Sequence, residues 1–325
     1  MDTVLESNFR GQLLDRRKRL EEAINLKSSN DYLLNLLIEV NAALERMDKG
    51  TYGICEVCHD PIEEDRLMVD PLIRVCLGDL DHHQQESLER DLELASKMQN
   101  ALLPKKDLHS EDWDISYVYL PAGPVSGDYC DIINLKNDEL LFVLADVTGK
   151  GVAASLLMTQ IHAIFHSLSS FDPPLEKLLE QVNRLFCEST AYSHFATLVA
   201  GKLFKNGEIE IVNAGHCLPI VLKKYDIINI DSSTVPLGIF CNMEYQVQKL
   251  KLEKGESLIL YTDGLSEARG KTEEEYGEKR IMDFTLKSFQ NNPSELIDSL
   301  INNVNEFTLN SKLTDDLTIM AIKKM

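Results

Sequence analysis

The sequence predicts an α+β protein: antiparallel sheets flanked by helices, preceded by a helical hairpin, a small cysteine finger and a connector helix. Residues 107–325 alternate short apolar runs with turn residues, which is typical of antiparallel strands with helices on the outer faces. Residues 3–48 and 81–103 lack proline and repeat apolar residues at helical spacing. A Cys-x-x-Cys pair lies between these two helical regions.

The composition is that of an acidic globular chain. Its 325 residues suggest two or three domains, and 33 Lys and Arg against 53 Asp and Glu give a net charge of -20. This excess of negative charge disfavours nonspecific binding to nucleic acid or to an anionic membrane. We find neither a bilayer-spanning apolar run nor a signal-peptide core in residues 1–22, so we expect a cytoplasmic protein. Seven unevenly spread cysteines suit reduced thiols or metal ligands better than a disulfide framework.

Residues 1–50 are predicted to form a helical hairpin. Its apolar positions recur at three- and four-residue steps, and they are Leu13, Leu20, Ile24, Leu33, Leu36, Leu37, Val40, Leu44 and Met47. The break falls at residues 28–31, where Ser29 or Asn30 can cap the second helix. The simplest interpretation of this hairpin is a packing or oligomerisation arm.

Residues 51–80 are predicted to form a zinc finger. The candidate ligands are Cys55, Cys58, Cys76 and Asp79. Two thiolates on one knuckle and a third on a returning knuckle suit tetrahedral zinc, and aspartate is an acceptable fourth ligand. His82 or His83 is an alternative fourth ligand. A metal-free remnant or a redox-sensitive thiol cluster is the alternative to a zinc site.

The hairpin and finger together resemble the DksA/TraR-type zinc-finger family. The shared features are the Tyr52-Gly53 entry to the first cysteine pair, the Arg66-Leu67 pair, Pro71 and the third cysteine. Asp79 stands where that family has a fourth cysteine, so we expect a weaker zinc site. In that family the hairpin tip can enter RNA polymerase. The short arms and the absence of a clear acidic motif at this tip do not extend that activity to this chain.

Residues 81–106 are predicted to form a connector helix that Pro104 ends. Its seam positions step by four, three, four and three residues, as in a short coiled coil, and they are Leu88, Leu92, Ala95, Gln99 and Leu102. Two interpretations stay open. The helix lies on the following domain, or its 81–103 segment forms a homodimer and passes a change of state to that domain.

Residues 107–325 are predicted to form one domain of strands and helices. The expected strands are 115–120, 132–135, 140–146, 196–203, 208–213, 219–222, 257–261 and 317–322, and the expected helices are 153–167, 175–189 and 293–309. Asn206-Gly207 predicts a tight hairpin between two of these strands.

Aspartates recur in this region where a strand meets a turn. They are Asp128, Asp146, Asp263 and the pair Asp315-Asp316. Each alone fits an ordinary turn. Together, with few basic residues nearby, they would repel one another unless cations lay between them. They therefore predict a two-metal hydrolytic site.

Residues 107–325 resemble the metal-dependent serine/threonine phosphatases of the type 2C superfamily, in its bacterial SpoIIE/RsbU-like branch. The motifs that carry the resemblance are 126–128 (SGD), 146–151 (DVTGKG), 213–216 (NAGH), 236–238 (PLG), 261–268 (YTDGLSEA), 315–318 (DDLT) and 101–104 (ALLP). The resemblance implies a sandwich of two antiparallel sheets with helices on both outer faces. It also implies two Mn²⁺ or Mg²⁺ ions at one end of the sandwich.

The resemblance assigns a role to each aspartate. Asp146 would bridge both ions, and the backbone carbonyl of Val147 would bind the first. Asp263 and Asp315 would hold the second ion, and Asp128 would contact the first through water. Asp316, the second residue of the final pair, is also a metal candidate. The implied catalytic residues are Asp128, Asp146, Asp263 and Asp315.

The implied chemistry is attack on phosphorus by a water activated between two metal ions. No covalent phospho-enzyme is needed, so the cysteines outside the finger are interpreted as buried small side chains, namely Cys130, Cys187, Cys217 and Cys241. His216 either protonates the leaving serine oxygen or belongs to a structural turn at Gly215. Lys150 either holds a phosphate or is a solvated surface residue.

Three functions are consistent with these motifs. The first is a phosphoserine/phosphothreonine phosphatase controlled by its N-terminal module, and the resemblance implies phosphorylated anti-sigma-factor antagonists as substrates. The second is a catalytically silent regulator that binds proteins through the zinc-finger module. The third is a hydrolase of another phosphoester, because the motifs define the metals and not the substrate.

Overall fold

The computed structural model describes residues 3–26, 31–63, 66–67, 70–79, 82–190, 194–231, 234–309 and 311–325. The chain forms two compact units, Met1–Leu92 and Glu93–Met325, and each is described by itself. The boundary falls inside helix α4, His82–Leu102. The finer division at residues 50, 80 and 106 stays a prediction.

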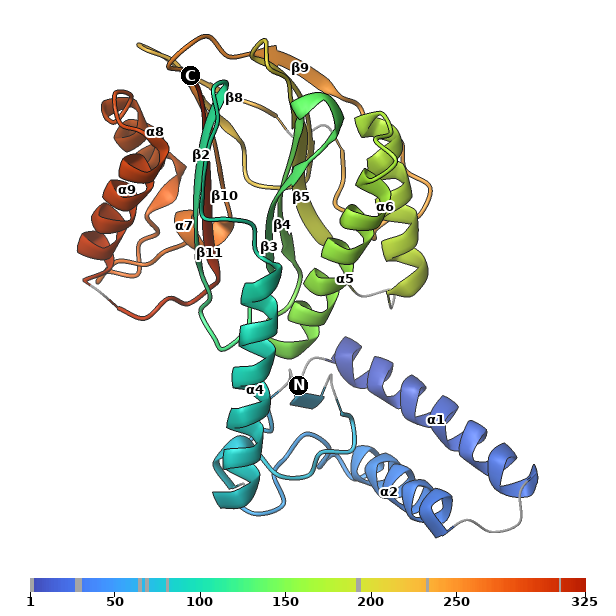
Figure 1. Ribbon diagram of the computed structural model, residues 1–325. Helices are drawn as coiled ribbons and strands as arrows, with labels where there is room; N and C mark the ends of the chain where they lie inside the picture. The colour runs from blue at the N-terminus through green and yellow to red at the C-terminus, as the bar shows by residue number, and fades with distance from the viewer. Residues whose placement is uncertain are drawn as a thin grey trace. The chain divides into compact units, whose positions relative to one another are not determined.

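The N-terminal unit contains the expected hairpin, formed by α1 (Thr3–Leu26) and α2 (Asp31–Asp48) (Figure 1). The predicted cap positions Ser29 and Asn30 lie outside the described residues. The hairpin and the finger share one hydrophobic core, whose buried members are Phe9, Leu13, Leu20, Val40, Ala43, Leu44, Met47, Tyr52, Cys55, Ile62, Leu67 and Cys76. Because both parts bury the same side chains, they form one packed unit and not an arm beside an independent finger.

The C-terminal unit is the expected sandwich of two antiparallel sheets (Figure 1). One sheet has the order β1-β2-β11-β10-β7-β8, and its strands are β1 (Asp107–His109), β2 (Trp113–Leu120), β11 (Leu317–Lys324), β10 (Ser257–Tyr261), β7 (Ile220–Leu222) and β8 (Ile227–Asn229). The other has the order β3-β4-β5-β6-β9, and its strands are β3 (Asp128–Asn134), β4 (Leu140–Val147), β5 (Ala196–Leu203), β6 (Glu208–Ala214) and β9 (Gln248–Lys251). The two-layer prediction is confirmed.

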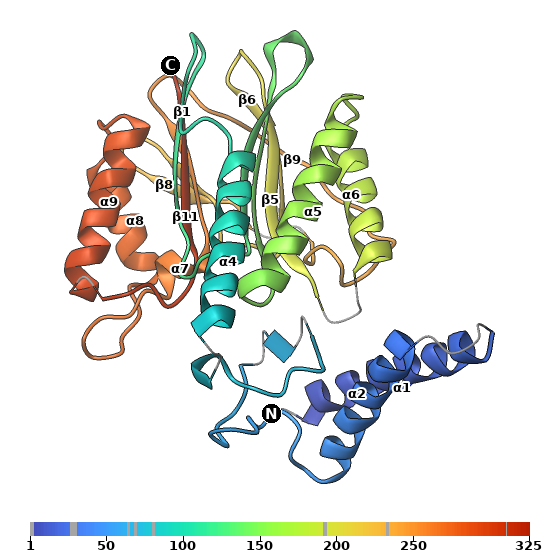
Figure 2. The ribbon, with the colours of Figure 1, turned by 60° about the horizontal axis from the view of Figure 1, so that its bottom comes forward.

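Helices cover both outer faces of the sandwich (Figures 1 and 2). Helices α5 (Gly151–Ser169) and α6 (Leu175–Ser189) pack on the sheet of β3, β4 and β5. Helices α8 (Gly277–Lys287) and α9 (Pro293–Thr308) pack on the sheet of β10 and β11. The side chains between the two sheets form a separate central cluster that includes Phe142 and Met320. The unit therefore has three hydrophobic clusters: one between the sheets and one under each layer of helices.

Strand β4 shows why an apolar run without alternation forms a strand here. Leu141 to Ala145 are all fully buried, because one face of the strand meets α5 and the other meets the facing sheet. A strand covered on both faces needs no polar side. The rigid core strand ends next to Asp146, which fixes the position of that carboxylate.

Two helices show how sequence determines their ends and environment. Helix α9 begins at Pro293, and the preceding Asn292 caps it and forms a capping box with Glu295. Helix α5 is the one described helix long and apolar enough to cross a membrane by length and composition. Its Met158, Ile161 and Phe165 are fully buried in the core of this unit, so it packs as a core helix.

Most expected elements of this unit form within a few residues of their predicted bounds. Strand β3 is longer than expected, because it begins at Asp128 and not at Ile132. The expectations omitted β1, β8, β9, α8 and the short helix α7 (Asp263–Ser266). Strands β1, β8 and β9 have three or four residues and lie at sheet edges, so they carry too little alternation to be recognised.

Candidate metal-dependent active site

The predicted aspartates are brought to one end of the sandwich. Asp128 begins β3 and Asp146 is the last but one residue of β4, and the two are directly opposite each other in the antiparallel register. In the other sheet, Asp263 follows β10 and the Asp315-Asp316 pair precedes β11. Strands β10 and β11 pair antiparallel, so the end of one and the start of the other lie at the same edge.

The carboxylate of Asp128 joins the two sheets. Its Oδ2 accepts a hydrogen bond from Thr262 Oγ1 at 3.0 Å and another from Thr318 Oγ1 at 2.5 Å. Thr262 Oγ1 in turn accepts from the backbone N–H of Thr318 at 2.9 Å. Asp128 lies on one sheet and both threonines lie on the strands of the other or directly after them. The four aspartate positions therefore belong to one constellation.

Like charges dominate the electrostatics of this constellation. Burial, followed by the charges of Asp263, Asp315 and Asp316, raises the pKa of Asp146 from 3.8 to about 7. Burial and the neighbouring Asp146 raise the pKa of Asp128 well above its ordinary value. The pKa of Asp263 is also raised, by burial and then by Asp315. A set of carboxylates that resist ionisation together is a set that a divalent cation would stabilise.

Within the described residues, the ion pair recorded for these aspartates is the one between Lys150 and Asp315. The Nζ of Lys150 lies 2.9 Å from Asp315 Oδ2 and donates to the Thr314 carbonyl at 2.8 Å. It therefore anchors the loop before β11 to the loop before α5. One exposed lysine does not neutralise several carboxylates, so the donor set, which is all oxygen, fits hard Mn²⁺ or Mg²⁺ ions.

Close backbone packing at the site depends on two glycines. A Cβ on Gly127 would lie 3.0 Å from the Val147 carbonyl oxygen, and one on Gly264 would lie 2.1 Å from the Asp316 carbonyl oxygen. These glycines allow the loops that carry Asp128, Asp263 and Asp316 to approach the neighbouring backbone. The glycines of the SGD and TDG motifs thus have a steric role at the site.

Adjacent residues Asp315 and Asp316 have different contacts. Asp316 is buried, and its two carboxylate oxygens accept from the backbone N–H groups of Ala122 at 2.7 Å and Gly127 at 2.9 Å. These bonds hold the loop that leads into Asp128. Asp315 has its carboxylate next to Lys150. The metal-ligand roles assigned to Asp128, Asp146, Val147, Asp263, Asp315 and Asp316 stay predictions.

Sequence reasoning missed three residues that position this site. Thr262 and Thr318 hold Asp128, and both lie inside recognised motifs whose threonines had no assigned role. Gln99, near the end of α4, is also involved: its Nε2 donates to the Ser126 carbonyl at 2.7 Å, and its Oε1 accepts from the Ser126 N–H at 3.0 Å. Gln99 occupies one of the predicted coiled-coil seam positions, and this buried side chain serves the catalytic unit itself.

His216 lies in a structural turn. The backbone N–H of His216 donates to Asn213 Oδ1 at 2.8 Å, and Asn213 Nδ2 donates to the His216 carbonyl at 3.2 Å. Its ring Nδ1 is 2.7 Å from Thr197 Oγ1, and burial lowers its pKa to about 4. A buried neutral imidazole that closes its own turn fits the structural alternative.

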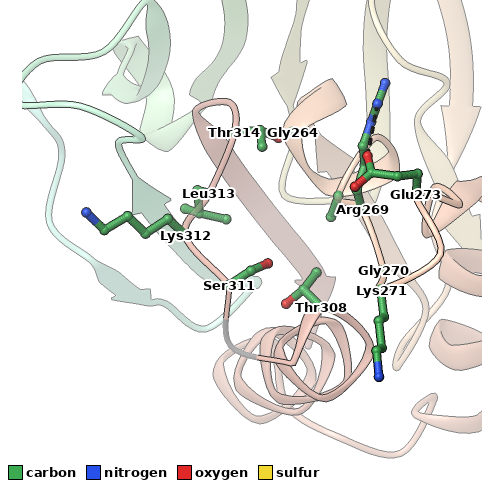
Figure 3. Close-up of a pocket in the computed structure, with 11 residues that line it drawn as sticks. Gly264, Arg269, Gly270, Lys271, Glu273, Thr308, Ser311, Lys312, Leu313 and Thr314 are labelled. Atoms are coloured by element: carbon green, nitrogen blue, oxygen red, sulfur yellow. Dashed lines mark hydrogen bonds and ion pairs between the residues drawn. The ribbon is translucent and has the colours of Figure 1, made fainter.

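A hollow of about 320 Å³ lies beside the site (Figure 3). Gly264, directly after Asp263, and Thr314, directly before Asp315, are part of its lining. Figure 3 shows Lys271 and Lys312 on opposite sides of this hollow. The charged lining residues are Arg269, Lys271 and Lys312 against Glu273, so the rim carries a net positive charge in a chain that is acidic overall.

The predicted finger ligands converge in the N-terminal unit. Asp79 Oδ2 accepts from Cys55 Sγ and from Cys76 Sγ, each at 3.2 Å, and Cys58 Sγ is 3.5 Å from Cys76 Sγ. One ligand atom from each of the four residues lies within 4.8 Å of all the others. Three thiols and one carboxylate at these separations fit tetrahedral zinc. The side chains of His82 and His83, the alternative fourth ligands, lie outside the described residues.

The cysteines of the C-terminal unit correct part of the sequence interpretation. Cys130 is fully buried, as expected, and Cys217 is half-buried. Cys187 on α6 and Cys241 form a disulfide across 54 residues of chain. The expectation that these two are buried, unpaired side chains was wrong, because Cys241 is exposed and packing of α6 brings the pair together.

Comparison with known proteins agrees with this geometry. Residues 136–324 match the family described as stage II sporulation protein E (SpoIIE), and residues 50–78 match the prokaryotic dksA/traR C4-type zinc finger. The fourth-ligand position, Asp79, lies just outside the second match.

Two curated relatives and one solved structure are informative. The chain is 30% identical to protein IcfG of Synechocystis over 71% of its own length and 41% of that protein's. It is 27% identical to the phosphoserine phosphatase RsbU of Bacillus subtilis, over 79% of each chain. The SiaA-PP2C domain of Pseudomonas aeruginosa shares the fold, with a TM-score of 0.63 at 18% identity over 74% of this chain and 98% of that one.

The SpoIIE match covers more than half of the 325 residues, and it includes four of the five aspartates that the sandwich brings to one end. The fifth, Asp128, lies just before the matched range, directly opposite Asp146 in the antiparallel register. The chain belongs to the SpoIIE family, and its C-terminal unit has the type 2C phosphatase fold.

Proposed function

We propose that this protein is a metal-dependent protein phosphatase that hydrolyses phosphoserine and phosphothreonine. The observation that supports this most directly is the carboxylate constellation, in which Asp128 is tied across both sheets and Asp146 is surrounded by like charges. Such a site is unfavourable unless it binds cations. The name of RsbU, a phosphoserine phosphatase, supports the same reaction class.

Each residue of the site has a proposed role in catalysis. Two Mn²⁺ or Mg²⁺ ions, when bound, would lower the pKa of the attacking water and offset the charge of the phosphoryl oxygens. Asp146, the Val147 carbonyl, Asp263, Asp315 and, through water, Asp128 would hold them.

The surrounding residues fix those ligands. Thr262 and Thr318 orient the Asp128 carboxylate by donating to one of its oxygens, which leaves the other oxygen for the metal side. Asp316 holds the loop before Asp128, and Lys150 holds Asp315. A ligand set preorganised in this way needs little rearrangement when the metals and the phosphate bind.

The proposed substrate is a phosphorylated protein of the anti-sigma-factor antagonist class. The hollow beside Asp263 carries Lys271 and Lys312 on its rim, and it would place a phosphorylated loop near the metals. Local positive charge matters here, because a chain of net charge -20 would otherwise repel an anionic substrate.

The N-terminal module is proposed to regulate this activity through α4, in a homodimer and in the cytoplasm. Gln99 of α4 holds both backbone groups of Ser126, two residues before Asp128. A shift of α4 would therefore move a metal-ligand loop. On the same helix Leu94 and Met98 are exposed, one turn apart, and offer an apolar face for a second copy. Removal of residues 1–80 is expected to change the rate and leave the catalytic unit folded.

A silent regulator is the second candidate. It is favoured by the finger, whose four ligand atoms lie close together, whereas the aspartates of the catalytic unit do not form so close a group among the described residues. In that case the finger would bind a protein partner and the phosphatase fold would be a scaffold. Hydrolysis of a different phosphoester would show as activity on small phosphoesters and none on phosphoproteins.

The deciding experiment is phosphate release from a phosphoserine protein, with and without Mn²⁺, for the wild type, Asp146→Asn and Asp138→Asn. Asp138 is an exposed aspartate at the opposite end of the β3–β4 hairpin, so its variant controls for loss of a charge. Mn²⁺-dependent release that Asp146→Asn abolishes and Asp138→Asn retains would support the enzyme. Absence of release from the full chain and from a chain lacking residues 1–80 would favour the silent regulator.

A further inference from the structure

A second cluster of potential metal ligands lies on the outer face of the sheet that carries Asp128 and Asp146. His162 and His166 are one helical turn apart on α5, and Asp131 lies on β3 beneath them. His166 Nε2 is 2.7 Å from Asp131 Oδ2, and His162 Nε2 is 4.0 Å from the same oxygen. The two imidazole rings lie 4.2 Å apart between centroids. The three side chains thus converge on one point.

The Asp131 carboxylate is buried and firmly oriented. Its side chain is 3% exposed, Oδ1 accepts from the Ile132 N–H at 2.7 Å, and Oδ2 accepts from the Tyr129 hydroxyl at 2.8 Å. Burial raises the pKa of Tyr129 well above its ordinary value, so this hydroxyl keeps its proton and remains a donor. Partners of this kind orient metal-ligating carboxylates in proteins.

A permanent cation is missing from the recorded ion pairs of this carboxylate. Within the described part of the chain, those pairs are with His162 and His166 alone. Burial and the neighbouring His166 lower the pKa of His162, which favours the neutral form of the ring that binds metals. A buried carboxylate beside a neutral histidine leaves room for a positive charge from another source.

We propose that Asp131, His162 and His166 form a transition-metal site that binds Zn²⁺ or a similar nitrogen-preferring divalent ion. One ligand atom from each residue lies within 4.8 Å of the other two, and small side-chain rotations would bring all three to the roughly 2.0–2.2 Å bonds of zinc. Two imidazoles and one carboxylate suit zinc, nickel or cobalt, whereas Mg²⁺ prefers sites made only of oxygen. The His166 side chain is 46% exposed, which gives an ion access and leaves a position for water.

This site would clamp α5 to β3. Helix α5 begins at Gly151, after the loop that follows Asp146, and β3 begins at Asp128. A metal bound between the helix and the strand would stabilise the packing behind the proposed catalytic loops. The inference concerns binding and stability, so it stands or falls independently of the proposed phosphatase activity.

The simpler alternative is an ordinary His–Asp hydrogen bond, and the chain supplies a matched control for it. His109 Nδ1 lies 2.6 Å from Asp114 Oδ1, with an exposed histidine and a largely buried aspartate. This pair has the same chemistry but is not part of a group of three potential ligands in the described residues. His109→Gln therefore removes one His–Asp bond without touching the proposed site.

The test uses the full chain with its finger loaded with zinc and with saturating Mg²⁺ present. Zn²⁺ is titrated by calorimetry into the wild type, His162→Gln, His166→Gln and His109→Gln, and bound zinc is counted by elemental analysis. We expect the wild type and His109→Gln to bind one more zinc than the other two. The two site variants should lose at least about tenfold in zinc affinity for that ion. Zinc should raise the thermal midpoint of the C-terminal unit only where the extra ion binds.

Equal stoichiometry and equal thermal shifts in all four proteins would overturn the proposal and leave a hydrogen-bonded pair. His166→Gln decides the outcome if His162→Gln fails to fold, because His166 is the more exposed of the two. Substitution with Co²⁺ adds a spectroscopic readout. Visible d–d bands from the second ion should appear in the wild type and in His109→Gln but not in His166→Gln.

Discussion

Replacing Asp146 by asparagine is expected to stabilise the metal-free protein while removing its response to Mn²⁺. The substitution preserves the shape of the side chain and removes one charge from a group of carboxylates. In the absence of metal, that charge is repelled by Asp263, Asp315 and Asp316 and is disfavoured by burial. A ligand that is costly without metal and useful with it should give opposite effects under the two conditions.

The magnitude follows from the pKa of Asp146, which rises from 3.8 to about 7 on folding. Because the folded state binds the proton more tightly than the unfolded state, the free energy of unfolding should fall as the pH rises between these two values. Above pH 7 the penalty is constant at about 4 kcal/mol, from about three pH units at about 1.4 kcal/mol each. Asparagine carries no such penalty, so the advantage of the variant should grow from near zero at pH 4 to roughly this value at pH 7.5.

Urea denaturation of the zinc-loaded full chain, in buffer free of Mn²⁺ and Mg²⁺, would measure this difference at several pH values. Asp138→Asn is the control, because its side chain is 83% exposed and it lies far along the same hairpin. A lower stability of Asp146→Asn than of the wild type at pH 7.5 without metal would contradict the expected charge repulsion. Equal stabilisation of the variant and the wild type by saturating Mn²⁺ would contradict a role of Asp146 in metal binding.

Three further predictions concern individual contacts. Thr318→Val removes a buried donor to Asp128, so it should lower the free energy of unfolding by roughly 1–3 kcal/mol and reduce Mn²⁺-dependent activity. Thr318→Ser keeps the hydroxyl and should retain both stability and activity. Equal behaviour of the two variants would contradict this role of Thr318. In a chelator competition, Asp79→Cys should bind zinc more tightly than the wild type, and Asp79→Ala should bind it more weakly. An unchanged zinc affinity in Asp79→Ala would remove Asp79 from the proposed ligand set. Cys187→Ser should lower the free energy of unfolding under oxidising conditions by up to about 4 kcal/mol, which is the loop-closure value for 54 residues. It should have little effect under reducing conditions. If the wild type has the same stability with and without reductant, Cys187 and Cys241 are not bonded.

The sequence was sufficient to place the aspartates because each lies beside a strong local signal. Asp146 ends an apolar run, and Asp263 precedes a glycine turn, so strand and turn rules locate both. The finger itself could be located for the same reason, since Cys55 and Cys58 form a short motif of fixed spacing, and the zinc-ligand roles stay a prediction. Elements that depend on fewer than about ten neighbouring residues could therefore be predicted from the sequence. The two-layer fold could be predicted as well, from the alternation of strands and turns and from the family motifs in residues 107–325.

Features that depend on tertiary register were not recovered. Thr262 and Thr318 reach Asp128 only because the two sheets face each other, and 134 and 190 residues separate the partners. The helical spacing of His162 and His166 is visible in the sequence, but Asp131 joins them only through the packing of α5 on β3. No local pattern links such residues, because the contact is created by the core and not by the neighbouring chain.

The aspartates of the site lower the stability of the metal-free fold, whereas the apolar residues of β4 raise it, and the two groups are neighbours in the sequence at Asp146. A buried aspartate among like charges destabilises the metal-free fold, and so does a buried Asp128. The compensation is adjacent: Leu141 to Ala145 of β4 are fully buried on both faces, and each large side chain there contributes roughly 1.5–3 kcal/mol by burial. A strand that is buried on both faces therefore leads directly into charges that are unfavourable without metal. Placing this proposed ligand at the end of that strand would keep the carboxylate fixed in the absence of metal, so that a cation would meet a site that is already formed.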